Sequence, residues 1–176
     1  MFNNFINGIN LVINEPYPSI NGLKENLSLA YKIKKSYSSK HSEFSCISKY
    51  LFQELALDEN LKEIKHALNA IAMVEMKHLQ ILGEILVKLG LSPTFTYINK
   101  LDNETYWQSD LIDYNLDLME LLKNNIKDEE IAIKNYKDII KYANDEIITD
   151  IINRIILDEE HHIKIFKSIL KNLVYK

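Results

Sequence analysis

Four stretches of the chain repeat apolar residues every three or four positions, and shorter segments without this pattern separate them. Such a repeat is typical of helices that bury one face and expose the other. It predicts helices over about residues 24–57, 60–88, 111–142 and 146–174. In the first stretch the recurring apolar positions are Leu29, Ile33, Tyr37, Phe44, Ile47, Leu51 and Leu55.

The lengths of the connections predict how these helices are arranged. Residues 58–60 and 143–145 are short turns, so the first and last helix pairs must each be antiparallel. Gly90 and Pro93 end the second helix, and a link of about 20 residues follows, which can reach roughly 60 Å. A helix of about 29 residues is only roughly 43 Å long, so the link can cross the whole bundle. We therefore expect an all-α, up-down-down-up four-helix bundle with one long crossover between its second and third helices.

Two segments fall outside the predicted helices. Residues 1–21 mix polar and apolar positions and are expected to form an extended arm, with residues 22–176 forming the bundle. Residues 91–110 lack clear periodicity and are expected to form a connection with a short turn of helix near Tyr106 and Trp107. Trp107 is expected to cover one end or side of the bundle.

Composition and charge exclude several classes of protein. The chain is 47% hydrophobic and 26% charged, which is ordinary for a globular domain. A net charge of −4 argues against a nucleic-acid interface, and no apolar run reaches the roughly 18 residues that cross a bilayer. The first residues do not resemble a signal peptide, so we expect a cytoplasmic protein. The single cysteine, Cys46, excludes an intrachain disulfide and a Cys-x-x-Cys site, and is expected to be a buried structural thiol.

The word Glu-x-x-His occurs twice, beginning at Glu75 and at Glu159 and ending at His78 and His162. Each copy follows an upstream glutamate, and the six residues together are Glu43, Glu75, His78, Glu129, Glu159 and His162. The two gaps from upstream glutamate to motif are 32 and 30 residues, about one helix–turn–helix. Four carboxylates and two imidazoles are what two adjacent metal ions need at the centre of a four-helix bundle.

Helical spacing indicates which of these side chains face the core. The positions three, four and seven residues from Glu75 and from Glu159 are apolar apart from the motif histidines, so both motifs lie on buried faces. Glu160 shares its face with polar residues, and His161 shares its face with Asp158 and Lys164. We therefore assign Glu160 and His161 to the rim of the bundle.

The upstream glutamates belong to an internal repeat. Glu129 is stacked with apolar residues, whereas its neighbour Glu130 is stacked with lysines, so Glu129 is expected to face inward. Glu43 precedes Tyr50 by seven residues, as Glu129 precedes Tyr136. Two related hairpins predict a site with pseudo-twofold symmetry. Tyr50 and Tyr136 are candidates for hydrogen bonds to the carboxylates, with plain core packing as the alternative.

Charge favours a metal at this cluster. Each buried ion without compensation costs at least several kcal/mol, so four glutamates need counter-charges. Two divalent cations would cancel four carboxylates and leave the imidazoles neutral. Carboxylate and imidazole ligands together suit iron or manganese, and zinc is chemically compatible.

With these motifs, the chain resembles the ferritin-like superfamily over roughly residues 24–174, and the rubrerythrin-like di-iron proteins more than the cage ferritins. The resemblance implies two iron ions, or alternatively two manganese ions, that react with peroxide or dioxygen. It implies Glu75 and Glu159 as the bridging, catalytic carboxylates, with one further glutamate and one histidine for each ion. A homodimer and an external electron donor are also implied, with neither nucleic acid nor membrane as a partner.

The chain departs from rubrerythrins in two respects. One cysteine cannot build the rubredoxin module that carries paired Cys-x-x-Cys motifs, and Ala132 stands where an additional glutamate is usual. The chain also ends soon after the fourth helix, which disfavours a storage ferritin with a fifth helix. The leading hypothesis is a rubrerythrin-like peroxidase or oxidoreductase. The alternatives are a ferroxidase or iron-storage protein, a manganese catalase and, least favoured, a metal-free structural bundle.

Overall fold

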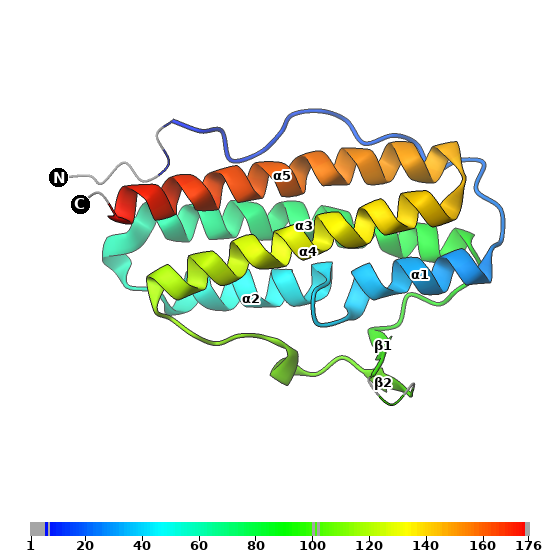
Figure 1. Ribbon diagram of the computed structural model, residues 1–176, viewed down its shortest axis with the longest axis horizontal. Coiled ribbons are helices and arrows are strands. Elements are labelled where there is room, and N and C mark those ends of the chain that lie inside the picture. Colours follow the sequence, from blue (N-terminus) through cyan, green and yellow to red (C-terminus); the bar gives the residue numbers. More distant parts are fainter. Residues whose placement is uncertain (1–5, 7, 100, 102, 175–176) are drawn as a thin grey trace.

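A computed structural model of the protein describes residues 6, 8–99, 101 and 103–174 (Figure 1). Its long helices form a four-helix bundle with one long crossover, which confirms the predicted fold class. The elements are α1 (Leu27–Ser38), α2 (Glu43–Ala56), α3 (Lys62–Lys88), α4 (Leu118–Ala143) and α5 (Glu146–Val174). A single turn of 3-10 helix, Glu59–Leu61, precedes α3. None of the helices within the described ranges is long and apolar enough to span a membrane.

The first predicted helix is in fact two helices, so the prediction of one continuous helix over residues 24–57 was wrong. α1 and α2 lie end to end along the same side of the bundle and are separated by residues 39–42 (Figure 1). The Ser42 and Ser45 hydroxyls donate hydrogen bonds to the Ser39 carbonyl at 2.7 and 2.6 Å. Serine hydroxyls that bond the backbone in this way compete with helical hydrogen bonds. The serine-rich sequence therefore supports the break.

The crossover between α3 and α4 differs from the prediction. Thr96–Ile98 (β1) pairs antiparallel with Glu104–Tyr106 (β2), so the helical turn expected near Tyr106 and Trp107 was wrong. A turn of 3-10 helix occurs instead at Ser109–Leu111, and α4 begins at Leu118, later than predicted. Trp107 does cover the side of the bundle, since its indole packs against Phe44 and donates to Ser45 Oγ at 2.8 Å.

The N-terminal arm lies against the outside of the bundle and follows α5 for much of its length (Figure 1). Its described residues up to Asn26 contain no helix or strand. The arm nevertheless packs on the core: Ile9 and Leu11 contact one apolar cluster, and Tyr17, Ile20 and Leu23 contact another.

The two apolar clusters fill the two ends of the bundle. One combines α1 with the C-terminal parts of α3 and α4 and the N-terminal part of α5. The other combines α2 with the opposite parts of the same three helices. Between them lies a layer of buried charged residues, to which each of α2–α5 contributes a glutamate. The fold therefore places its ionisable groups at the middle of the bundle.

The turn between α4 and α5 generates a prediction about stability. Asn144 ends α4 in the left-handed conformation (φ 46°, ψ 44°). Glycine adopts this conformation freely and asparagine and aspartate tolerate it, whereas other residues adopt it at a cost of about 1–2 kcal/mol. We expect Asn144→Ala to lower the free energy of unfolding by about 1 kcal/mol, measured by urea denaturation. Asn144→Gly, the matched control, should be tolerated. Equal stability of the alanine and glycine variants would contradict this reading of the turn.

Candidate metal centre

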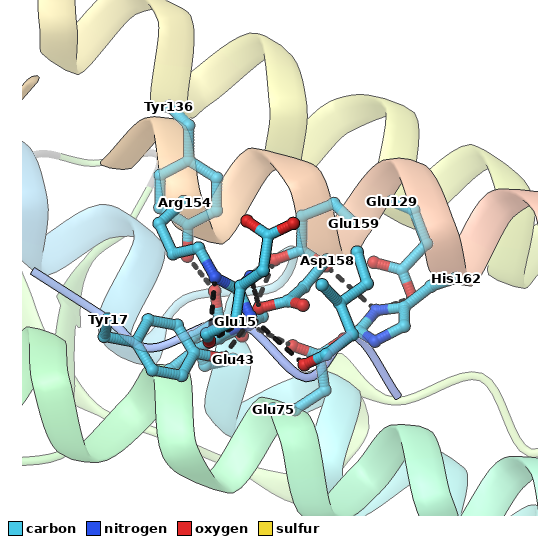
Figure 2. A network of polar contacts seen from close by, with 12 residues as sticks. Glu15, Tyr17, Glu43, Glu75, Glu129, Tyr136, Arg154, Asp158, Glu159 and His162 are labelled. Carbon is cyan, nitrogen blue, oxygen red and sulfur yellow. Dashed lines mark hydrogen bonds and ion pairs between the residues drawn. The ribbon is translucent and has the colours of Figure 1, made fainter. Parts of the chain in front are cut away.

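The structure brings the six predicted residues together in the middle of the bundle (Figure 2). Each is at most 3% exposed. They form two overlapping groups, and within each group one potential ligand atom per residue lies within 4.8 Å of the others. The groups are Glu43, Glu75, His78 and Glu159, and Glu75, Glu129, Glu159 and His162. Glu75 and Glu159 belong to both, so they lie between two adjacent positions that could each hold an ion.

Both histidines direct Nδ1 toward the carboxylates. His78 Nδ1 lies 3.0 Å from Glu75 Oε2, 3.2 Å from Glu159 Oε1 and 3.6 Å from Glu43 Oε2. His162 Nδ1 lies 3.1 Å from a carboxylate oxygen of Glu75 and of Glu159. Its distance to Glu129 Oε1 is 3.9 Å. The two histidines therefore have matching surroundings, as expected from two related hairpins.

The pKa values of the cluster residues are shifted by burial and by the neighbouring charges. Burial raises the pKa of Glu43 well above its usual range, and the charges of Glu75 and Glu159 raise it further. The pKa of Glu129 is raised for the same reasons. Burial alone would lower the pKa of His162, but the Glu75 carboxylate and the hydrogen bonds that the imidazole donates to Glu159 and Glu75 outweigh it and raise the pKa to about 10. All three shifts favour the protonated forms of Glu43, Glu129 and His162.

Among the described residues, two buried acceptor oxygens have no hydrogen bond of their own, Glu75 Oε1 and Glu159 Oε1. Each lies beside a histidine Nδ1, at 3.1 Å from His162 and 3.2 Å from His78, but that nitrogen is hydrogen-bonded to the other glutamate of the pair. A buried carboxylate oxygen without its own donor is unfavourable. Both oxygens belong to the two glutamates that lie between the ion positions. Cations there would satisfy them, so the donor set fits a pair of metal ions.

The two buried tyrosines contact the outer carboxylates, but across the repeat and not within it. The Tyr50 hydroxyl donates to Glu129 Oε1, and the Tyr136 hydroxyl donates to Glu43 Oε1. This confirms that both tyrosines hydrogen-bond the carboxylates, and the sequence did not predict which tyrosine contacts which glutamate. The antiparallel packing places each hydroxyl beside the glutamate of the other hairpin.

The neighbouring glutamates lie outside the cluster, as their helical faces predicted. Glu130 and Glu160 are exposed. His161 is partly exposed, and its Nε2 donates to the Asn10 carbonyl at 2.6 Å. The periodic pattern therefore distinguished the inward glutamate from its neighbour on both helices.

The sequence analysis missed Asp158, which it placed beside His161 on a polar face. Asp158 is 2% exposed, and its Oδ2 accepts a hydrogen bond from His78 Nε2 at 3.0 Å. Burial raises its pKa, but hydrogen bonds from His78, Arg154 and Tyr17 outweigh this and lower it to about 2. The repeat contained a signal: Asp158 occupies the position that matches Val74, so a charge stands where the other hairpin has an apolar residue.

A cavity of about 290 Å³ opens beside the cluster, between α2, α4 and residues 110–113 of the crossover. Cys46, one turn after Glu43, and Asp128, directly before Glu129, both contribute to its lining. Lys49 is buried at this cavity and donates to Asp128, which also bonds His41 at 2.8 Å. Cys46 is buried, and burial raises the pKa of its thiol. Neither Glu43 nor Glu129 lines the cavity, so it lies beside the cluster without opening onto these two carboxylates.

The model of the rubrerythrin family matches residues 25–170 of the chain. Among solved structures, KatB, a manganese catalase from Anabaena, is similar, with a TM-score of 0.79 and 22% identity; the match covers 93% of this chain and 80% of KatB. A dodecameric thioferritin from Bacteroides fragilis has a TM-score of 0.68 and 19% identity, and that match covers 88% of this chain and 90% of the thioferritin. The bacterioferritin of Desulfovibrio desulfuricans, which has a diiron site, has a TM-score of 0.68 at 19% identity, covering 85% and 81%. At these identities the structures establish a shared fold. A search of curated protein sequences found no match.

The crossed tyrosine contacts generate a prediction for the metal-free protein. In double-mutant cycles, Tyr136→Phe and Glu43→Gln should show an interaction energy within about 0.5–3 kcal/mol, because one side chain donates to the other. The effects of Tyr136→Phe and Glu129→Gln on the free energy of unfolding should be closer to additive. Tyr50→Phe is the matched control: its effect should be coupled to that of Glu129→Gln and nearly additive with that of Glu43→Gln. Urea denaturation measures all four cycles, and stronger coupling of each tyrosine to the glutamate on its own helix would contradict the crossed arrangement.

Proposed function

The chain belongs to the rubrerythrin family, and we propose that its buried cluster holds two redox-active metal ions that react with peroxide or dioxygen. The observation that carries the proposal is the pair of overlapping ligand groups with Glu75 and Glu159 in common. A shared pair of carboxylates between two ion positions is the arrangement of di-metal carboxylate sites in four-helix bundles.

In this proposal each ion has its own glutamate and histidine. Glu43 and His78 would hold one ion, Glu129 and His162 would hold the other, and Glu75 and Glu159 would bridge them. The four carboxylates would balance two divalent cations, which would also satisfy the Glu75 and Glu159 oxygens that have no hydrogen bond of their own within the described ranges. Binding would displace the protons that the cluster otherwise retains.

We propose iron as the resident metal, with manganese as the alternative. Family membership favours iron, while the similar fold of a manganese catalase keeps manganese in consideration. The donors do not distinguish the two, because carboxylate and imidazole suit both. Bound in this site, either metal pair would exchange electrons with an oxygen-containing substrate.

The residues around the site would position its ligands and exclude water. Tyr50 and Tyr136 hold the outer carboxylates of Glu129 and Glu43 through their hydroxyls. Asp158 accepts from His78 Nε2 and so leaves Nδ1, which faces the carboxylates, free to bind a metal. The apolar clusters on both sides keep this layer dry. We also propose an external electron donor, because one cysteine cannot build a paired Cys-x-x-Cys module within these 176 residues.

The helical faces give a mutational test of the ligand assignment. We expect Glu159→Ala to abolish stoichiometric metal binding, because it removes a ligand common to both positions. Glu160→Ala, its exposed neighbour and matched control, should bind nearly as much metal as the unsubstituted chain. Metal analysis of both purified variants, with helix content checked by circular dichroism, measures the difference. Equal losses would refute the assignment.

Metal content and activity together test the proposed reaction. Protein from cells supplied with both iron and manganese should contain about two ions per chain, and consume peroxide. Two iron ions with consumption that requires a reductant would indicate a peroxidase. Two manganese ions with dioxygen release and no reductant would indicate a catalase. Rapid oxidation of ferrous iron with poor steady-state peroxide consumption would indicate a ferroxidase. No metal after anaerobic reconstitution with either ion would refute the proposal.

A further inference from the structure

The N-terminal arm is tied to the bundle by Arg154, the only arginine in the chain. Its guanidinium donates to the Glu15 carbonyl from Nε and Nη2 at 3.2 and 2.9 Å, and to the Ile13 carbonyl from Nη2 at 3.3 Å. It also lies over the Tyr17 ring, 4.5 Å from the centroid. The planar fork of arginine donors suits such a multiple contact, which a lysine could not reproduce. Residues 13–17 are called the strap below.

The strap contributes a side chain to the outer layer of the metal centre (Figure 2). The Tyr17 hydroxyl donates to Asp158 Oδ2 at 2.7 Å, and the Tyr17 ring lies edge-on to the His78 ring with centroids 6.0 Å apart. Arg154 Nη1 lies 2.6 Å from the same Asp158 oxygen. Asp158 Oδ2 therefore faces three donors, one from the strap, one from α5 and one from His78 on α3. A carboxylate held in this way has little freedom to turn away from His78.

Among the residues that the structure describes, the hydrogen-bonded carboxylate of Asp158 supports His78 but has no counterpart beside His162, the matching histidine of the repeat. The repeat that matches Glu159 to Glu75 also matches Asp158 to Val74 and Arg154 to Ala70, neither of which has a polar side chain. Within the described part of the chain, the carboxylate contacts of His162 are all made by Nδ1. His78 has carboxylates at both ring nitrogens. The two ion positions therefore have similar inner ligands but different outer partners.

We propose that the strap makes the two metal positions unequal, so that the position of Glu43 and His78 binds its ion more tightly than the position of Glu129 and His162. This inference rests on the proposed di-metal function. A carboxylate that accepts from the outer nitrogen of a metal-binding histidine orients the ring and increases its basicity. Tyr17 and Arg154 act through Asp158 and are positioning residues. At low metal concentration the position of His78 is then filled before the other.

The test titrates the metal-free, full-length protein with Mn²⁺ and follows the free ion by electron paramagnetic resonance. The unsubstituted chain should bind two ions with distinguishable dissociation constants. Tyr17→Phe keeps the ring but removes the hydroxyl, and should weaken the tighter constant by about 2- to 10-fold, the range for one hydrogen bond, while leaving the weaker constant unchanged. Asp158→Asn should weaken the tighter constant by about 10- to 100-fold. Tyr31→Phe, on the exposed surface of α1, is the matched control and should change neither constant.

Two further backgrounds show which position responds. In His162→Ala the remaining position should still be weakened by Tyr17→Phe, whereas in His78→Ala the same substitution should have no effect on binding. His78→Gln and His162→Gln replace the alanine variants if those do not fold. Equal effects of Tyr17→Phe in the two backgrounds, or unchanged constants in the Tyr17→Phe chain, would overturn the inference while leaving the di-metal function intact. Absence of Mn²⁺ binding by the unsubstituted chain would overturn both.

Discussion

The structure depends on burying six ionisable side chains in one layer of a helical bundle. Uncompensated buried ions cost several kcal/mol each, so such a layer persists only where every charge has a partner. The tyrosine hydroxyls and the two imidazoles supply part of this compensation. In the described part of the chain, Glu75 and Glu159 each still have an oxygen without a hydrogen bond of its own, which is the feature that points to cations. The apolar clusters at either end make the bundle stable enough to hold this layer.

The buried side chains at the centre of the bundle are arranged nearly symmetrically, whereas the segments that pack around the helices are not. The two hairpins supply matching glutamates and histidines, and each tyrosine reaches across to the other hairpin. The flanking segments have no such symmetry: the arm follows α5, whereas the crossover covers α2 and α4 and lines a cavity (Figure 1). One histidine is thereby connected to Asp158 and Tyr17, and the other is not. The surroundings of the two histidines therefore differ because of the arm segment that packs against α5 and because of Asp158 on α5 itself.

The shared fold does not decide the chemistry. The same architecture occurs in a manganese catalase and in a bacterioferritin with a diiron site. Fold similarity at about 20% identity leaves the metal and the reaction open, because function resides in the site and its surroundings. In this chain one feature beside the cluster that bears on the proposed function is the strap, which contacts Asp158 and leaves the helices as they are.

The sequence by itself determined whatever depends on helical periodicity. It predicted α5 at its observed bounds and the choice of Glu129 over Glu130 and of Glu159 over Glu160, because residues three or four positions apart share a face wherever the helix packs. Periodicity alone did not reveal the break at residues 39–42 or the strands of the crossover, although both are supported by contacts between residues close in the chain. Only the tertiary structure decided the crossed tyrosines and the contacts of Asp158 with Tyr17 and His78. In these cases the partner of each group comes from a segment distant in the chain, as with Tyr17 and Asp158. Local spacing contains no information about which distant groups meet, so those contacts follow from packing alone.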